Sequence, residues 1–236
     1  MPHKLNHLHR ALLLRFPQAM KTDSPCSARH LLIAFAVWAL VLQPLIKYGS
    51  RALGFAGGLW VGTAIAALLV LAAWALQRWM IGRSLIDAGF RNPSGWSPEE
   101  RVLVIQALVA MAVVMTWLFG SGAFGNLLRD GAIHALRAGV TGLIWGIVQE
   151  WVYRGWLQRG LLPRCGAFAA VLLANLAYTF GPLHAELWFA RAPAEISWGP
   201  LAAIFGIGLL FGSIYQRSGN LWLPALLHGL WPPNMR

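Results

Sequence analysis

Charged side chains are scarce in this sequence of 236 residues. They make up only 11% of the chain, whereas 58% of the residues are hydrophobic and the mean hydropathy is +0.57. Soluble domains usually carry about 25% charged residues. The composition therefore excludes an ordinary soluble domain and indicates an integral membrane protein.

Acidic residues are scarcer still, with 8 Asp and Glu against 19 Lys and Arg, which gives a net charge of +11. In a membrane protein, such an excess is expected in cytoplasmic loops. With a cytoplasmic N-terminus and seven alternating spans, the far side holds only Lys47, Arg51, Arg129, Arg137, Arg191 and Arg236. The other 13 of the 19 basic residues then lie on the cytoplasmic side, so we expect the N-terminus in the cytoplasm and the C-terminus on the other side of the lipid bilayer, and we expect no nucleic-acid partner.

Cysteine is also rare, since the chain has only Cys26 and Cys165. Two such residues form neither a disulfide framework nor a metal-binding pattern. The sequence has no internal repeat and no early apolar run of the kind found in secretory signal peptides. We expect no cofactor.

Long apolar stretches account for most of the chain. A helix needs about 20 mostly apolar residues to cross a bilayer, and only helices and closed barrels satisfy their backbone there. The candidate spans are 31–46, 54–76, 102–120, 138–157, 167–180, 199–215 and 221–231. The sequence thus predicts an all-α, polytopic transmembrane helical bundle of about seven spans. Polar residues interrupt the last four spans, so we expect any catalytic site to lie in the second half of the chain.

The hydrophilic loop 77–101 contains the start signal of a helix. Ser97 is followed by Pro98 and, three residues after Ser97, by Glu100. This order predicts a capping box with Ser97 as N-cap. Glu100 therefore receives a structural role and is not a candidate catalytic residue.

Glu150 and Arg154 are the main polar anomaly within the spans. Four residues apart on a helix, they share a face, which predicts an ion pair. Such a pair could be purely structural, but ionisable residues in membrane spans usually mark function. Gln149 lies about 100° away from Glu150 around the helix.

Two histidines, His184 and His228, fall in the same half of the chain. A carboxylate in an apolar pocket can act as a general base on water. One histidine could hold that water, and the other could stabilise the oxyanion of a tetrahedral intermediate. Two His and one Glu are also a zinc ligand set, but the chain lacks close spacing of the HExxH type, which makes a metal site the weaker alternative.

Three motifs in order carry a family resemblance. "QEWVYRG", "FGPLH" and "LPALLHGLW" resemble the EExxxR, FxxxH and final His motifs of the CPBP family, over about Gly142 to Asn234. That family contains CAAX prenyl proteases and bacteriocin-processing (Abi) proteins, which are glutamic-type intramembrane proteases. The resemblance implies a helical bundle and a site made of Glu150, Arg154, Phe180, His184 and His228.

The spans and the resemblance together give the expected organisation of the chain. Residues 1–29 form a basic cytoplasmic segment, either an amphipathic helix on an anionic leaflet or a mobile tail. Residues 30–137 form N-terminal membrane helices, and 138–236 form a CPBP-like catalytic helical core. We expect a multi-pass protein of a bacterial inner membrane.

Two positions depart from the family pattern. Gln149 stands where the first motif usually has the Glu that acts as base, and a glutamine cannot be a base. Pro232 stands four residues after His228, where Asn is common, although Asn234 follows two residues later. Either Glu150 has taken the base role, or the protein has lost hydrolysis and kept the fold.

The expected function is therefore an intramembrane endopeptidase that cleaves near the C-terminus of membrane-associated proteins carrying lipid-modified or sorting tails. Glu150 would activate water, His184 would hold it, and His228 would support the oxyanion. Arg154 would orient Glu150, with Gln149, Phe180 and Asn234 in support. The alternative is an inactive protein of the same fold that acts as an immunity factor or scaffold.

Overall fold

The structure is a computed structural model of the chain. It describes residues 27–45, 48, 61–106, 108–109, 112–113, 132–189 and 192–229. Asn234 and nearly all of the basic segment 1–29 lie outside these residues, so the expectations for them stay predictions. Every regular element within the described ranges is helical, which confirms the all-α prediction.

The described helices differ in hydrogen-bond type as well as in length. The α-helices are α2 (Ala28–Ala36), α4 (Val61–Leu76), α6 (Ala132–Glu150), α7 (Arg159–Phe180), α8 (Trp198–Ser218) and α9 (Trp222–Gly229). The π-helical segments are η1 (Val37–Leu42), η2 (Gln77–Ile81) and η4 (Trp151–Gln158), and the 3₁₀ turns are η3 (Pro93–Gly95), η5 (Pro182–Leu187) and η6 (Pro193–Glu195). A further helix covers 98–106.

Four helices within the described ranges are long and apolar enough to cross a membrane. They are Ala28–Leu45, Thr63–Ile81, Gly139–Phe180 and Trp198–Ser218. The third includes two of the expected spans, 138–157 and 167–180. The expected span 102–120 is described only in part, and the eight residues of α9 cover part of the last one.

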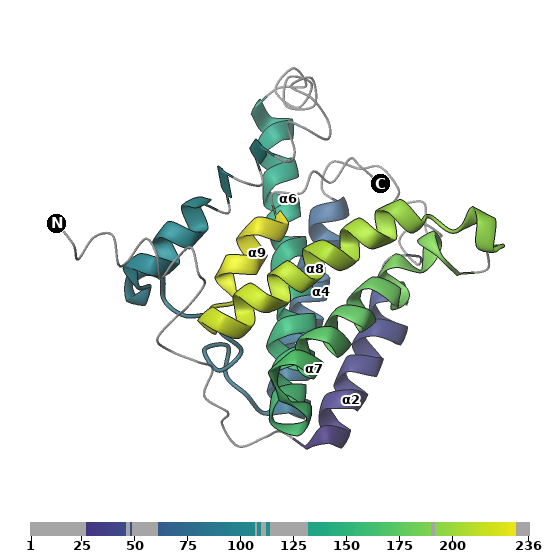
Figure 1. Cartoon of the computed structure of the whole chain (residues 1–236), viewed down its shortest axis with the longest axis horizontal. Helices are drawn as coiled ribbons and strands as arrows, with labels where there is room; N and C mark the ends of the chain where they lie inside the picture. Colours follow the sequence, from purple (N-terminus) through teal and green to yellow (C-terminus); the bar gives the residue numbers. More distant parts are fainter. Residues whose placement is uncertain are drawn as a thin grey trace.

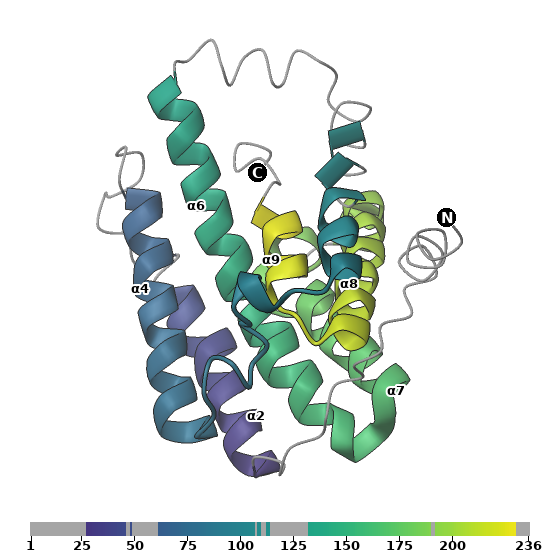
Figure 2. The same cartoon turned by 90° about the vertical axis from the view of Figure 1, so that its left-hand side faces the viewer.

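The chain reverses direction within α7, at Gly166. This residue has φ +77°, outside the helical region, in the middle of an otherwise helical run. Glycine adopts such a positive φ without the steric cost that a Cβ brings. Figure 2 shows the consequence: α6 and η4 descend, and α7 turns back along them. The reversal brings the C-terminal end of α7 next to the middle of the bundle.

Side-chain donors attach α8 to its neighbours along one face. Arg154 Nη2 donates to the carbonyl of Gly208 at 3.0 Å, and Asn175 Nδ2 donates to that of Phe205 at 2.9 Å. Gln158 Nε2 donates to the carbonyl of Gly212 at 2.9 Å. Interhelical hydrogen bonds and small residues are what hold helices together in lipid, where the hydrophobic effect does not.

Gln77 joins the second membrane helix to η4. Its Oε1 accepts hydrogen bonds from the indole N–H groups of both Trp151 and Trp156. Its Nε2 donates to the carbonyls of Arg83 and Ser84, so every side-chain hydrogen-bonding group of this buried amide has a partner. Gln77 thereby fixes the helix segment that follows Glu150.

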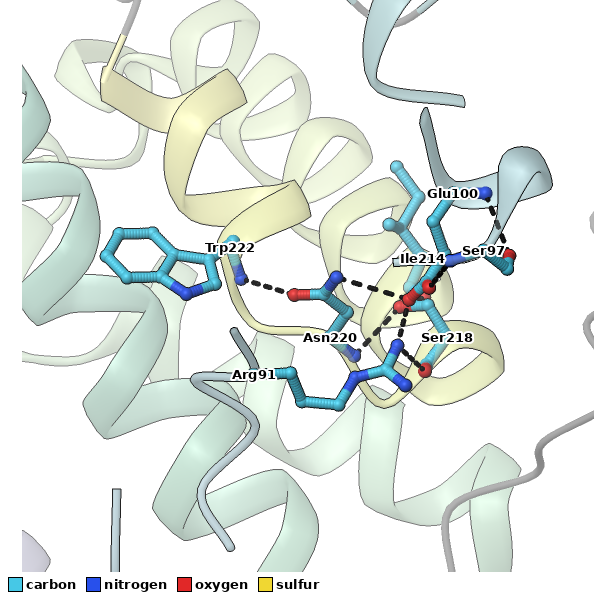
Figure 3. Close-up of polar contacts among 7 residues, drawn as sticks. All are labelled: Arg91, Ser97, Glu100, Ile214, Ser218, Asn220 and Trp222. Atoms are coloured by element: carbon cyan, nitrogen blue, oxygen red, sulfur yellow. Dashed lines mark hydrogen bonds and ion pairs between the residues drawn. The ribbon is translucent and has the colours of Figure 1, made fainter. Parts of the chain in front are cut away.

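The predicted capping box is confirmed. Ser97 Oγ accepts from the backbone N–H of Glu100 at 3.2 Å, and Glu100 Oε2 accepts from the N–H of Ser97 at 2.8 Å. The carboxylate is buried and does more than cap, as Figure 3 shows. Its Oε1 also binds Arg91 Nη2 and accepts from Asn220 Nδ2 at 3.1 Å.

Asn220 extends this cluster to the start of α9. Its Oδ1 accepts from the backbone N–H of Trp222, the first residue of α9, at 3.1 Å. Arg91 Nη2 also donates to the carbonyl of Ser218 at the end of α8. We call Arg91, Glu100 and Asn220 the loop anchor. It attaches the loop before the 98–106 helix to the turn between α8 and α9 (Figure 3).

Candidate functional site

Glu150 ends α6 in the interior of the bundle, with a fully buried side chain. Its two carboxylate oxygens have different partners. Oε1 lies 2.9 Å from Nδ1 of His228, and Oε2 lies 3.2 Å from Nε of Arg154. A buried carboxylate is costly unless it is paired. Here Oε1 is hydrogen-bonded to His228, whereas Oε2 faces the guanidinium of Arg154 in an ion pair without a hydrogen bond.

The predicted ion pair between Glu150 and Arg154 is therefore present. Arg154 is itself 1% exposed, and its other contacts are also with buried groups. Nη2 donates to the carbonyl of Gly208, and the guanidinium lies 4.8 Å from the centre of the Tyr178 ring. These contacts hold the guanidinium in one position beside the Glu150 carboxylate.

His228 reaches Glu150 because α9 packs very closely on α6. A Cβ added to Gly146 would lie 2.7 Å from the carbonyl oxygen of Ala225, and one added to Gly229 would lie 2.7 Å from the Cα of Leu143. Both positions therefore require glycine. Figure 1 shows α9 lying against the middle of α6, beside α8.

The imidazole of His228 is more exposed than the carboxylate that it contacts. Its side chain is 15% exposed, whereas that of Glu150 is 0% exposed. The nitrogen that does not face Glu150, Nε2, lies 3.4 Å from the hydroxyl of Tyr178. The ring also packs on Phe211, with the ring centres 5.7 Å apart. The two nitrogens of His228 thus face two different polar groups.

His184 joins the cluster through Tyr178. It lies in η5, just after α7 ends, and its Nδ1 is 2.9 Å from the carbonyl oxygen of Tyr178. The His184 and Tyr178 rings meet edge to face, with centres 5.0 Å apart. Both histidines thus contact the same tyrosine.

Tyr178 is the site residue that sequence reasoning missed. Its hydroxyl faces His228, its ring contacts Arg154 and His184, and its carbonyl binds His184. A tyrosine in an apolar span carries no distinctive signal, because such residues are common at membrane interfaces. The only sign in the sequence that Tyr178 belongs to the site was its position, about one and a half helical turns before His184.

The three residues predicted to support the site are Gln149, Phe180 and Asn234, and their surroundings differ. Gln149 is buried, and its Nε2 has no hydrogen-bond partner among the described residues. Phe180 is 41% exposed and packs on Phe205, with ring centres 6.5 Å apart, so the structure does not bring it into the cluster. Asn234 lies outside the described residues.

The geometry also bears on the zinc alternative. Within the described ranges, no three His, Cys, Asp or Glu side chains are grouped so that they could hold a metal ion. Glu150 and His228 face each other, and the second nitrogen of His228 contacts a tyrosine hydroxyl. The arrangement is an ion pair between Arg154 and Glu150 that continues through hydrogen-bond contacts from Glu150 to His228 and from His228 to Tyr178.

Fold and site together define the chain as an integral membrane protein of helices, with a buried acid–imidazole pair in its C-terminal half. The model of one protein family, the Rce1-like type II CAAX prenyl endopeptidases, matches residues 131–232. This segment includes every site residue placed by the structure, and the match agrees with the resemblance to the CPBP family: this part of the chain is similar to the CAAX proteases. No curated protein and no solved structure matches the chain.

Proposed function

We propose that this protein is an intramembrane endopeptidase that cleaves near the C-terminus of membrane-associated proteins, with water activated by the charge of Glu150. The observation that carries the proposal is the 2.9 Å contact between Glu150 and His228 inside a membrane-spanning bundle. The family match over residues 131–232 supports a hydrolase of the CAAX protease type.

The chemistry of peptide hydrolysis needs a proton acceptor for water and a proton donor for the leaving amine. A carboxylate and an imidazole in hydrogen-bond contact can supply both. Arg154, which is held by Gly208 and Tyr178, keeps the Glu150 carboxylate in one orientation. Charged groups act more strongly at a site from which bulk water is excluded than in solution.

The location of the site favours substrates that are themselves bound to the membrane. The candidate residues lie on helices that are long and apolar enough to cross a bilayer, and on α9 packed against them. A peptide would therefore reach them from the lipid or the interface. We propose proteins with prenylated or membrane-inserted C-terminal tails as substrates, a bacterial inner membrane as the location, and a cytoplasmic N-terminus.

One observation favours the alternative of an inactive protein. Gln149 occupies the position where the family motif usually has its first acid, and the buried amide cannot accept a proton from water. In that case the Glu150–Arg154 pair would only stabilise the bundle, and the protein would serve as an immunity factor or scaffold.

Cleavage of defined peptides by the protein in liposomes distinguishes the two. The peptides carry either a prenylated C-terminal tail or a hydrophobic sorting tail, and the variants are Glu150→Gln and Gln149→Glu. A matched control is Glu195→Gln, which removes an exposed carboxylate from η6. The proposal predicts cleavage by the wild type and by the control, and none by Glu150→Gln. Cleavage that appears only in Gln149→Glu would establish the inactive alternative.

A further inference from the structure

Peptide hydrolysis places negative charge on the former carbonyl oxygen, and enzymes lower the barrier by directing hydrogen-bond donors at that oxygen. In this structure, both ring nitrogens of His228 already have partners. Nδ1 lies 2.9 Å from Oε1 of Glu150, and Nε2 lies 3.4 Å from the hydroxyl of Tyr178. A donor in the same part of the bundle whose hydrogen bonds are unused is therefore the stronger candidate for contact with a substrate carbonyl.

Gln149 carries such a donor. Its side chain is 4% exposed, and its Nε2 has no hydrogen-bond partner among the described residues. An amide nitrogen carries two N–H groups. A buried donor without a partner destabilises a folded protein, and buried polar groups are nearly always paired. The unused amide of Gln149, next to Glu150 in the sequence, therefore indicates a partner that binds during function.

The neighbours of Gln149 along the helix place it on the side of α6 where the site lies. A Cβ added to Gly146, three residues earlier, would lie 2.7 Å from the backbone of α9, the helix that carries His228. Tyr153, four residues later, packs on Tyr178, with ring centres 5.2 Å apart. Residues three and four apart are neighbours on a helix surface. Gln149 thus lies between a contact with α9 and a contact with the tyrosine that faces His228.

We infer that Nε2 of Gln149 donates a hydrogen bond to the carbonyl oxygen of the scissile peptide bond and stabilises the oxyanion that forms there. This inference rests on the proposed function, in which Glu150 is the base, and names a second catalytic residue for it. It also gives a role to the glutamine at the first position of the motif. A glutamine supplies N–H groups and, unlike a second glutamate, adds no negative charge beside Glu150.

The reaction balances without any further reactant. The oxygen of water bonds to the scissile carbonyl carbon, and its proton moves to Glu150, whose Oε2 accepts no hydrogen bond from any described residue. The carbonyl π electrons move to the oxygen, which accepts the N–H of Gln149. When the tetrahedral intermediate collapses, the carbonyl re-forms, the C–N bond breaks, and the leaving nitrogen takes the proton from Glu150. An acid and an amine are released, and Gln149 is unchanged.

Gln149→Met tests this role by peptide cleavage in liposomes, because methionine keeps the length of the side chain and removes its N–H groups. We expect kcat to fall by about 10²–10³-fold, the usual effect of removing one oxyanion donor, with KM changed by less than about threefold. Gln149→Glu should lose activity as well, because an ionised carboxylate has no proton to donate. The unfolding free energy of Gln149→Met should be unchanged or higher, since no hydrogen bond within the described protein is lost.

Gln158→Met is the matched control, since it makes the same substitution at a buried amide two turns further along the chain. Nε2 of Gln158 donates to the carbonyl of Gly212 at 2.9 Å, so this amide already has a structural partner. We expect Gln158→Met to lower the unfolding free energy and to keep kcat within about threefold of the wild type. The two variants thus separate loss of a buried amide from loss of a donor to the substrate.

Binding of a phosphinic peptide gives a readout without turnover. In this probe, a tetrahedral phosphinate anion replaces the scissile amide of a peptide that the wild type cleaves. We expect Gln149→Met to weaken phosphinate binding by about 10²–10³-fold, as much as it lowers kcat/KM, because a donor to the oxyanion acts on the transition state. A purely structural role would weaken binding of the phosphinate and of the uncleaved peptide equally.

Three outcomes would overturn the inference and leave the proposed function intact. They are a kcat of Gln149→Met within about threefold of the wild type, an equal loss of affinity for phosphinate and peptide, and a Gln149→Glu variant that is more active than a cleaving wild type. If the wild type cleaves none of the peptides, the proposed function fails, and this inference fails with it.

Discussion

Nδ1 of His228 lies 2.9 Å from Oε1 of Glu150, although the two residues are 78 positions apart in the sequence. The contact depends on the short α9 packing onto α6 at the level where α6 ends. It joins the first and the last of the three family motifs. The following predictions test how this contact is supported.

The charges of Glu150 and Arg154 should be energetically coupled, so that the cost of removing one charge depends on whether the other is present. Removing one partner of a buried pair leaves an uncompensated charge, which costs about 3–5 kcal/mol. We expect Arg154→Met to lower the free energy of unfolding by about that amount, and the double variant Glu150→Gln/Arg154→Met to recover a large part of it. Unfolding of the purified protein in mixed detergents measures this difference.

Arg164→Met is the matched control for this pair, because Arg164 is exposed at the turn within α7. Surface substitutions usually change the unfolding free energy by less than about 0.5 kcal/mol. If the double variant is no more stable than Arg154→Met alone, then the two charges are not energetically coupled in the bundle.

The Glu150–Arg154 pair is also where the sequence was most informative. A four-residue spacing on a helix fixes which side chains share a face, so local geometry was enough to predict the contact. The Ser97–Glu100 capping box was predictable for the same reason. Apolar composition similarly gave the helical class, because a bilayer permits few other structures.

Contacts between distant segments could not be predicted in this way. The link from Glu100 to Asn220, and that from Gln77 to Trp151, depend on how helices pack, which no local pattern encodes. Tyr178 was missed because its role arises only when the reversal at Gly166 returns α7 to the site. Phe180 was expected in the site from its motif, but it lies toward the periphery.

The hydroxyl of Tyr178 should matter for turnover more than for stability. Tyr178→Phe keeps the ring that contacts Arg154 and His184 but removes the group facing His228. We expect kcat to fall by about tenfold or more with KM nearly unchanged, and the unfolding free energy to change by about 1 kcal/mol or less.

Tyr153→Phe is a close control for this change. Tyr153 is buried, its ring centre lies 5.2 Å from that of Tyr178, and its hydroxyl has no hydrogen-bond partner among the described residues. Its loss should leave kcat within about twofold and the stability unchanged or slightly higher. Equal loss of turnover in the two variants would show that the contact with His228 has no special role.

The loop anchor should influence the site from outside the membrane helices. Asn220→Ala removes both the hydrogen bond to Glu100 and the one that caps α9 at Trp222. Because α9 carries His228, we expect lower kcat together with a loss of about 1–2 kcal/mol in stability, the usual effect of removing a cap. Peptide cleavage and detergent unfolding measure the two effects.

Asn92→Ala serves as the control for the loop anchor. The side chain of Asn92 accepts a hydrogen bond from the N–H of Ser94, so it also caps a turn, but that turn is exposed and does not bind α9. We expect Asn92→Ala to leave kcat unchanged. A kcat as low as that of Asn220→Ala would indicate a general effect of the loop on folding, independent of the position of His228.

The close packing of α6 on α9 gives the last prediction. In Gly146→Ala, the new methyl group would lie 2.7 Å from the backbone of both Ala225 and Gly229, so α9 must move away from α6. The displacement should lengthen the contact between His228 and Glu150 and lower kcat by about 10²-fold, as misplacement by about 1 Å does at enzyme sites.

In the control variant Gly139→Ala, on the same helix, a Cβ would meet no atom within 4 Å. This second variant should keep full activity and gain up to about 1 kcal/mol in stability, because alanine favours a helix more than glycine does. If both variants cleave peptide at the wild-type rate, the contact between α6 and α9 does not position the acid–imidazole pair.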